Sequence, residues 1–203
     1  MKRPETLKAF LKKQLKQHGG DIPPLEPIDP LRALVRGCLA ANTTDHKAEE
    51  ALAIIDREFV DLNELRVATE LECIDIIGAR YPGVEDRVPQ MIHCLNGVFA
   101  REHTLSLERL RTIPRREARQ FLKELPGITP FIDGYTTLYG FGIPAFPVDE
   151  TILAALEDEG IVEPDAKTDP RQRMEQAQKF VEHHLKDDEC HKLFWCMRHK
   201  KRK

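Results

Sequence analysis

The sequence has no long hydrophobic run and few aromatic residues. It contains no stretch of roughly 18 apolar residues, and its N-terminus (MKRPETLKAF) lacks the apolar segment of a signal peptide. We therefore expect a cytoplasmic protein with no membrane partner. Aromatic residues make up 6% of the chain, and no alternating strand pair or βαβ unit occurs. Apolar residues recur instead at helical spacing, which predicts an all-α fold.

The cysteines do not follow the spacing of a metal site or a redox pair. There are five, an odd number, and no two of them form a CxxC motif. We therefore expect buried thiols in a reducing compartment and no bound metal. The net charge of −3 gives no general attraction to nucleic acid, and the basic residues 198–203 are typical of a solvated chain end.

Two helices joined by a tight turn are predicted over residues 114–140. Pro126 and Gly127 end the first helix (PRREARQFLKEL), because proline cannot continue a helix and glycine tolerates positive φ. Pro130 suits the first position of the second helix. Free N–H groups at the start of that helix could bind phosphate. The same shape also serves as a plain helix corner, and the turn alone favours the corner.

Three segments carry a more specific pattern when they are taken together. Residues 30–45 (PLRALVRGCLAANTTD) place a helix before a polar loop, residues 125–127 (LPG) start the turn, and residues 141–149 (FGIPAFPVD) lead to an aspartate. In this order and at this spacing they resemble the helix-hairpin-helix DNA glycosylases of the endonuclease III type. Cys190 and His191, in the last expected helix of this chain, are similar to the penultimate stretch of that family.

The resemblance implies a two-domain, all-α architecture. A six-helix domain would span residues 24–143, with the hairpin at about 114–140, and a second helical domain would combine residues 1–23 and 144–203. Double-stranded DNA with a damaged or mismatched base would be the partner and would lie in the groove between the domains. We expect the protein to act as a monomer.

The resemblance also assigns a catalytic carboxylate to Asp149. A glycosylase flips the target nucleotide into a pocket, and positive charge develops on the sugar as the glycosidic bond breaks. A carboxylate stabilises that charge and can activate a water molecule. Aspartate is equally common as a helix N-cap, and the sequence alone favours a cap of the helix that starts at Glu150. The two roles are compatible, since a helix N-terminus favours an ionised carboxylate.

The DNA contacts implied by the resemblance lie in two loops. Asn42 and Thr44 follow the first long helix, and Asn42 matches the position that fills the gap left by the flipped base. An asparagine after a helix is more commonly a C-cap, so both interpretations stay open. Gly127, Ile128 and Thr129 would present their amides to a DNA phosphate.

Several residues depart from the family. Bifunctional members carry a lysine where this chain has Phe131, so no Schiff base can form and a monofunctional, hydrolytic enzyme is expected. Phe131 would instead line the base pocket, although a single phenylalanine is more often part of the core. Thr129, Pro130 and Asp133 should weaken the grip on phosphate, because they add a side chain, remove an N–H and add negative charge.

No cofactor is expected. The iron–sulfur cluster typical of the family needs four cysteines in a C-terminal loop, and this chain ends where that loop would begin. The basic end of the chain would replace part of the DNA contact made by that loop.

Three functions remain possible from the sequence. The first is a monofunctional base-excision DNA glycosylase that uses Asp149. The second is a non-catalytic helix-hairpin-helix protein that binds DNA or abasic sites, and the third is a helical module that has lost DNA binding. No motif identifies the base.

Overall fold

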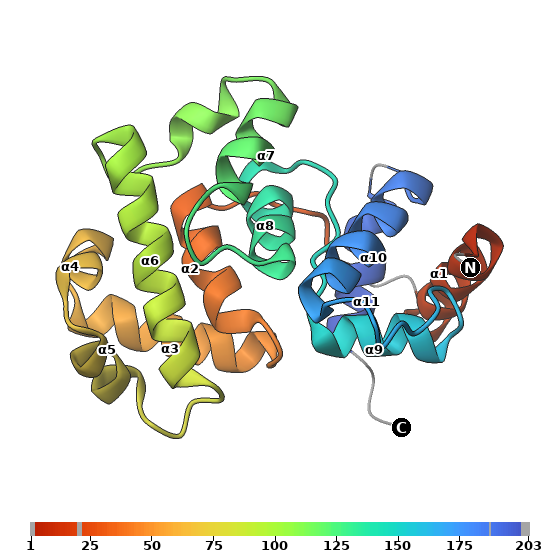
Figure 1. Cartoon of the computed structure of the whole chain (residues 1–203), viewed down its shortest axis with the longest axis horizontal. Helices are drawn as coiled ribbons and strands as arrows, with labels where there is room; N and C mark the ends of the chain where they lie inside the picture. The colour runs from red at the N-terminus through yellow and green to blue at the C-terminus, as the bar shows by residue number, and fades with distance from the viewer. Residues whose placement is uncertain (1–2, 20–21, 187, 200–203) are drawn as a thin grey trace.

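Every regular element of the structure is helical in the residues it describes, which are 3–19, 22–186 and 188–199 of a computed structural model (Figure 1). The all-α prediction is confirmed. The α-helices in these ranges are α1 (Pro4–His18), α2 (Pro30–Ala40), α3 (Asp45–Glu58), α4 (Leu62–Val67), α5 (Glu70–Ile77), α6 (Val84–Glu102), α7 (Arg115–Lys123), α8 (Pro130–Tyr135), α9 (Glu150–Asp158), α10 (Pro170–His184) and α11 (Glu189–Arg198). Short 3₁₀ and π turns occupy Glu108–Arg111 and Thr136–Gly140.

Polar side chains fix where many of the helices begin. Thr44 accepts a hydrogen bond from the Lys47 amide of α3. Pro130 takes the first position of α8, as the sequence predicts. The same kind of N-cap starts further helices, at Asp29, Asp61, Thr69, Thr129, Asp149 and Asp169. Pro89 lies inside a helix rather than in its first turn, because α6 begins at Val84 and continues through it.

The helices form two groups around one apolar core. In the first group α2 packs against α3, α6 and α8. In the second group α1 lies beside α11, so the N-terminal helix joins the C-terminal helices, and α9 packs against α10 (Figure 1). The α8–α10 contact connects the groups. The α1–α11 contact brings the two ends of the chain together, while the division into two domains at residue 143 stays a prediction.

Aromatic rings join the two groups of helices. Phe194 of α11 lies with its ring centroid 5.9 Å from Phe131, 6.1 Å from Tyr135 and 6.2 Å from Phe146. These four side chains are each at most 1% exposed. Burial of large aromatic side chains is among the strongest sources of packing energy, so the cluster holds α11 against α8.

None of the helices in the described ranges is both long enough and apolar enough to span a bilayer.

Candidate active site and nucleic-acid interface

Asp149 caps α9 and is almost completely buried. Its side chain is 3% exposed, and its Oδ1 accepts a hydrogen bond from the Ile152 amide at 2.8 Å. Its Oδ2 accepts a second hydrogen bond, also 2.8 Å long, from the amide of Asn42 at the end of α2. The capping interpretation is therefore correct. The carboxylate is also held by a residue more than a hundred positions away.

Asn42 completes a reciprocal arrangement with α9. Its backbone lies in the left-handed region with φ of 51°, which asparagine tolerates better than most residues. Its side-chain Oδ1 accepts a hydrogen bond of 3.1 Å from the Glu150 amide. The side chain expected to enter the DNA thus caps α9 in this structure. Whether it also fills the gap in DNA stays a prediction.

Arg198 approaches Asp149 from the last turn of α11. Its guanidinium donates to Asp45 Oδ1 at 2.6 Å and to the Ala40 carbonyl oxygen at 3.1 Å. Nη1 of Arg198 lies 3.8 Å from Asp149 Oδ2. The side chain is 8% exposed. The interpretation of Arg198 as part of a solvated basic chain end is wrong, because its side chain lies on the buried side of α11. The residues beyond His199 lie outside the described structure.

A cavity of about 420 Å³ opens beside Asp149. Its walls come from the α2–α3 loop, the start of α6, the hairpin and the start of α9. Asp149 and Phe131 line it together with the amide side chains of Asn42 and Gln90. A nucleobase fits a space of this size, and amide side chains can hydrogen-bond to its edge.

Arg87 forms a fixed part of the cavity wall. Its guanidinium donates to the carbonyl oxygens of Pro82 at 2.6 Å and Leu39 at 2.8 Å. Burial lowers its pKa from the ordinary arginine value. Because these carbonyls take up its donors, Arg87 ties the loop before α6 to the end of α2 and so shapes the cavity.

Phe131 is buried in the core and also lines the cavity beside Asp149. Its ring is 1% exposed, stacks on Tyr135 with centroids 5.7 Å apart, and lies 5.5 Å from the Arg198 guanidinium. Both sequence interpretations therefore hold in part, since the side chain belongs to the core and also lines the cavity. Contact with a flipped base stays a prediction.

The hairpin turn places Gly127 at a positive φ, a backbone conformation that glycine adopts without strain. Gly127 has φ of 82°, and a Cβ atom there would lie 2.8 Å from the Gln90 carbonyl oxygen. The amide of Ile128 is bonded to the Leu125 carbonyl oxygen at 3.3 Å. The hydroxyl of Thr129, the N-cap of α8, accepts a hydrogen bond from the Ile132 amide. This internal use of the Ile128 amide leaves fewer donors for a phosphate than expected.

Thr44 is exposed and caps α3.

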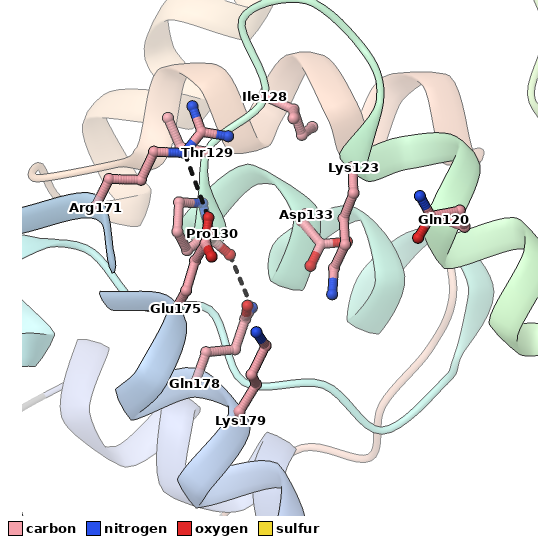
Figure 2. A pocket seen from close by; sticks show the side chains of 10 residues that line it. All are labelled: Gln120, Lys123, Ile128, Thr129, Pro130, Asp133, Arg171, Glu175, Gln178 and Lys179. Carbon is pink, nitrogen blue, oxygen red and sulfur yellow. Dashed lines mark hydrogen bonds and ion pairs between the residues drawn. The ribbon is translucent and has the colours of Figure 1, made fainter. Parts of the chain in front are cut away.

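A second cavity, of about 280 Å³, is lined by residues of the hairpin and of α10 (Figure 2). Thr129 lines both cavities. Lys123 of α7 and Lys179 of α10 extend toward this space from opposite sides, and Arg171 is paired with Glu175 at 3.4 Å (Figure 2). The two lysines give this face a positive charge next to the cavity beside Asp149, which suits a polyanion such as a DNA backbone.

Asp133 does not place a free charge on this face. Its carboxylate is 2% exposed and pairs with Arg119 at 3.0 Å, and Arg119 also bonds Glu182 of α10 at 2.6 Å. Burial raises the pKa of Asp133, and Arg119 opposes that rise. The expected repulsion of phosphate by Asp133 is therefore largely screened by Arg119. Through its ion pairs with Asp133 and Glu182, Arg119 instead connects the hairpin to α10.

Metal-binding side chains do not gather in the described ranges, where no three His, Cys, Asp or Glu residues are close enough to hold an ion. The five cysteines are buried and free. Burial raises the pKa of Cys190 to about 12, which fits an inert thiol. The expectation of no iron–sulfur cluster stays a prediction.

Sequence reasoning missed Arg198 as a part of the site. The signal was present, because the residue lies four positions after Phe194 and so falls on the buried stripe of the helix. Arg87 was missed because nothing in the sequence reveals its carbonyl partners.

Three solved structures show how the fold compares with known proteins. A trapped endonuclease III–DNA covalent intermediate matches with a TM-score of 0.71 and 16% identity, over 98% of this chain and 85% of that chain. The apo-form of Clostridium acetobutylicum 8-oxoguanine glycosylase/lyase matches with 0.68 and 15%, over 96% and 69%. H. pylori 3-methyladenine DNA glycosylase (MagIII), bound to 1,N6-ethenoadenine, matches with 0.63 and 16%, over 97% and 95%. No family model and no curated protein matches the sequence. The chain therefore has the helix-hairpin-helix fold shared by the endonuclease III-like DNA glycosylases.

Proposed function

We propose that the protein is a monofunctional DNA glycosylase that removes a damaged or mismatched base from duplex DNA. The observation that carries this proposal is the position of Asp149, a buried carboxylate at the wall of a cavity of about 420 Å³. The neighbours with this fold are DNA glycosylases, and one was trapped on DNA. The proposal extends their reaction class to this chain.

Asp149 would act on the sugar of a nucleotide flipped into the cavity. The bond between sugar C1′ and the base nitrogen breaks, and its electron pair leaves with the base. The carboxylate stabilises the positive charge that develops on the sugar. A water oxygen then bonds to C1′ as Asp149 accepts a proton from that water, and the departing base gains a proton from solvent.

The lining of the cavity supports hydrolysis without strand cleavage. Phe131 occupies the hairpin position where an amine would be needed for a Schiff base. Among the described residues that line this cavity, none is a lysine. Water is therefore the nucleophile, and the product is an abasic site in an intact strand.

An excision assay tests the proposal. Wild type, Asp149→Asn and Asp158→Asn would be incubated with duplexes that carry oxidised, alkylated, deaminated or mismatched bases, with and without alkali. Asp158 is the matched control, since it is an exposed aspartate at the far end of the same helix. Strand breaks after alkali only, with wild type and Asp158→Asn but not Asp149→Asn, are expected. Breaks without alkali would contradict the hydrolytic mechanism.

A DNA-binding protein without excision is the second candidate. It is favoured by the hydrogen bonds that already occupy both oxygens of Asp149 and the side-chain oxygen of Asn42. Duplex binding without base release on any substrate would support this candidate and contradict the first.

A further inference from the structure

The catalytic carboxylate has a charged neighbour that does not face the cavity. Arg198 reaches Asp149 from α11, and it is not among the residues that line the cavity that would take the base, whereas Asp149 is. Arg198 lines a separate, smaller depression with Thr44 and Met197. The guanidinium therefore lies behind the carboxylate and would not touch a flipped nucleotide.

The distances show that Arg198 belongs mainly to Asp45. It donates to Asp45 Oδ1 through Nε at 3.1 Å and Nη2 at 2.6 Å, whereas the shortest ion-pair distance to Asp149 is 3.8 Å. One cation is thus shared unequally by two carboxylates, and the three groups together carry a net charge of −1. Asp45 balances Arg198, and the charge of Asp149 remains available to a cationic sugar.

The contacts of Arg198 also restrict where the carboxylate can point. Oδ1 of Asp149 is fixed by an amide of its own helix, and Oδ2 lies between the Asn42 amide and the arginine. A third contact, to the Ala40 carbonyl oxygen, holds the guanidinium against the end of α2. The Phe131 and Phe194 rings lie 5.5 and 5.8 Å from its central carbon and shield it from solvent. Packing and hydrogen bonds of this kind hold a reactive group in its productive geometry.

We propose that Arg198 is a positioning residue for the reaction assigned to Asp149: it orients the carboxylate from behind, and Asp45 prevents it from neutralising that carboxylate. This inference rests on the proposed function. It concerns the chemical step, so its loss should slow base release and leave DNA affinity largely unchanged.

The alternative is that Arg198 is only a structural connection between α11 and the α2–α3 loop. Both roles predict some loss of stability in Arg198→Met, so stability alone does not separate them. Leu193→Ala supplies the matched control, because Leu193 is a fully buried residue of the same helix without contact to Asp149 in the hydrogen bonds and ion pairs of the described chain.

The test measures base release and DNA binding separately. Single-turnover excision would be followed for wild type, Arg198→Met, Arg198→Lys and Leu193→Ala, on the best duplex found for wild type and at a temperature where all are folded. Affinity would be measured with a duplex that carries a non-cleavable abasic-site analogue. We expect Arg198→Met to slow release by about 10- to 100-fold, because small displacements of a reacting group have costs of this size. Its affinity should stay near that of wild type.

Arg198→Lys keeps the positive charge but loses the planar guanidinium that reaches both Asp45 and Asp149. We therefore expect its excision rate to lie between those of wild type and Arg198→Met. If Arg198→Met does not fold, this variant carries the test. Equal rates for wild type and the folded arginine variant would overturn the inference, as would an equal slowing by Leu193→Ala or a parallel loss of affinity. A wild type that binds DNA without excision would instead overturn the proposed function, and the role of Arg198 with it.

Discussion

Replacing Asp149 with asparagine should destabilise the protein, although asparagine is as good an N-cap as aspartate. The carboxylate accepts two backbone hydrogen bonds, one on each oxygen, at 2.8 Å from Ile152 and 2.8 Å from Asn42. Asparagine has one acceptor oxygen. If that oxygen keeps the cap of α9, the NH₂ group faces the Asn42 amide, and two donors meet in a buried place.

The structure also indicates the size of the effect. A hydrogen bond to a charged group contributes about 1.5–3 kcal/mol, and stranding a buried ion costs about 3–5 kcal/mol. Arg198 keeps its 2.6 Å contact with Asp45 when Asp149 is neutral, so no ion is stranded. We therefore expect Asp149→Asn to lower the free energy of unfolding by about 1.5–3 kcal/mol, the cost of one charge-assisted hydrogen bond.

Urea unfolding of wild type, Asp149→Asn and Asp158→Asn measures this difference at equilibrium. The control should stay within about 0.5 kcal/mol of wild type, since its side chain is exposed at the end of α9. Hydrogen exchange at the Asn42 amide supplies a local measurement, and exchange should be faster in Asp149→Asn. Unchanged stability together with unchanged exchange at Asn42 would refute the assignment of this hydrogen bond.

Other predictions concern the hairpin, the DNA-binding face and pH. Gly127→Ala should lower the free energy of unfolding by about 1–3 kcal/mol in urea unfolding, because φ is 82° and the new Cβ would lie 2.8 Å from a carbonyl oxygen of α6. Combined Lys123→Gln and Lys179→Gln substitution should reduce the slope of log affinity against log salt by about 2 in a DNA titration, if each lysine neutralises one phosphate. A hydrogen bond from Arg109 lowers the pKa of Glu102. That stabilisation is present above the ordinary glutamate pKa and is lost as pH falls through the lowered value, so Glu102→Gln should be destabilising at about pH 7, and the destabilisation should shrink as pH falls below the ordinary glutamate pKa.

Each of these predictions has a clear contrary result. An alanine variant at the hairpin that unfolds with wild-type stability would contradict the strained turn. For the lysines, the matched control is the pair Lys8→Gln and Lys12→Gln on exposed positions of α1, and equal slopes for the two pairs would remove the hairpin face from the DNA interface. A Glu102→Gln effect that grows on acidification would contradict the sign of the pKa shift.

Local rules in the sequence predicted the start of several helices and the backbone role of Asp149. Thr44, Pro130 and Asp149 act on atoms within a few residues of themselves, and such contacts follow from residue type and spacing. The sequence also indicated the resemblance that places Asp149 in a site. Its partners Asn42 and Arg198 could not be obtained in this way, because they arrive from distant parts of the chain.

The charged residues of the hairpin also have distant partners that the sequence does not reveal. From the sequence, Asp133 is a negative charge beside a phosphate path, which predicts weaker DNA binding. In the fold, Arg119 lies 14 positions earlier and Glu182 49 positions later, and the three form one buried network. The sign of a residue's charge can be read from the sequence. The electrostatic potential around that residue depends on charged partners that only the fold brings close to it.

The candidate active site is assembled from both groups of helices. Asn42 and Asp45 belong to the first group, while Asp149 and Arg198 belong to the second, and the contacts among these four cross the boundary between the groups. Neither group alone can hold the carboxylate in the observed orientation. The aromatic cluster around Phe194 and the Arg119–Glu182 pair span the same boundary, so they stabilise the docked arrangement in which the carboxylate is fixed. The docking of α11 against α2 and α3 is therefore the structural condition for the base release proposed for this site.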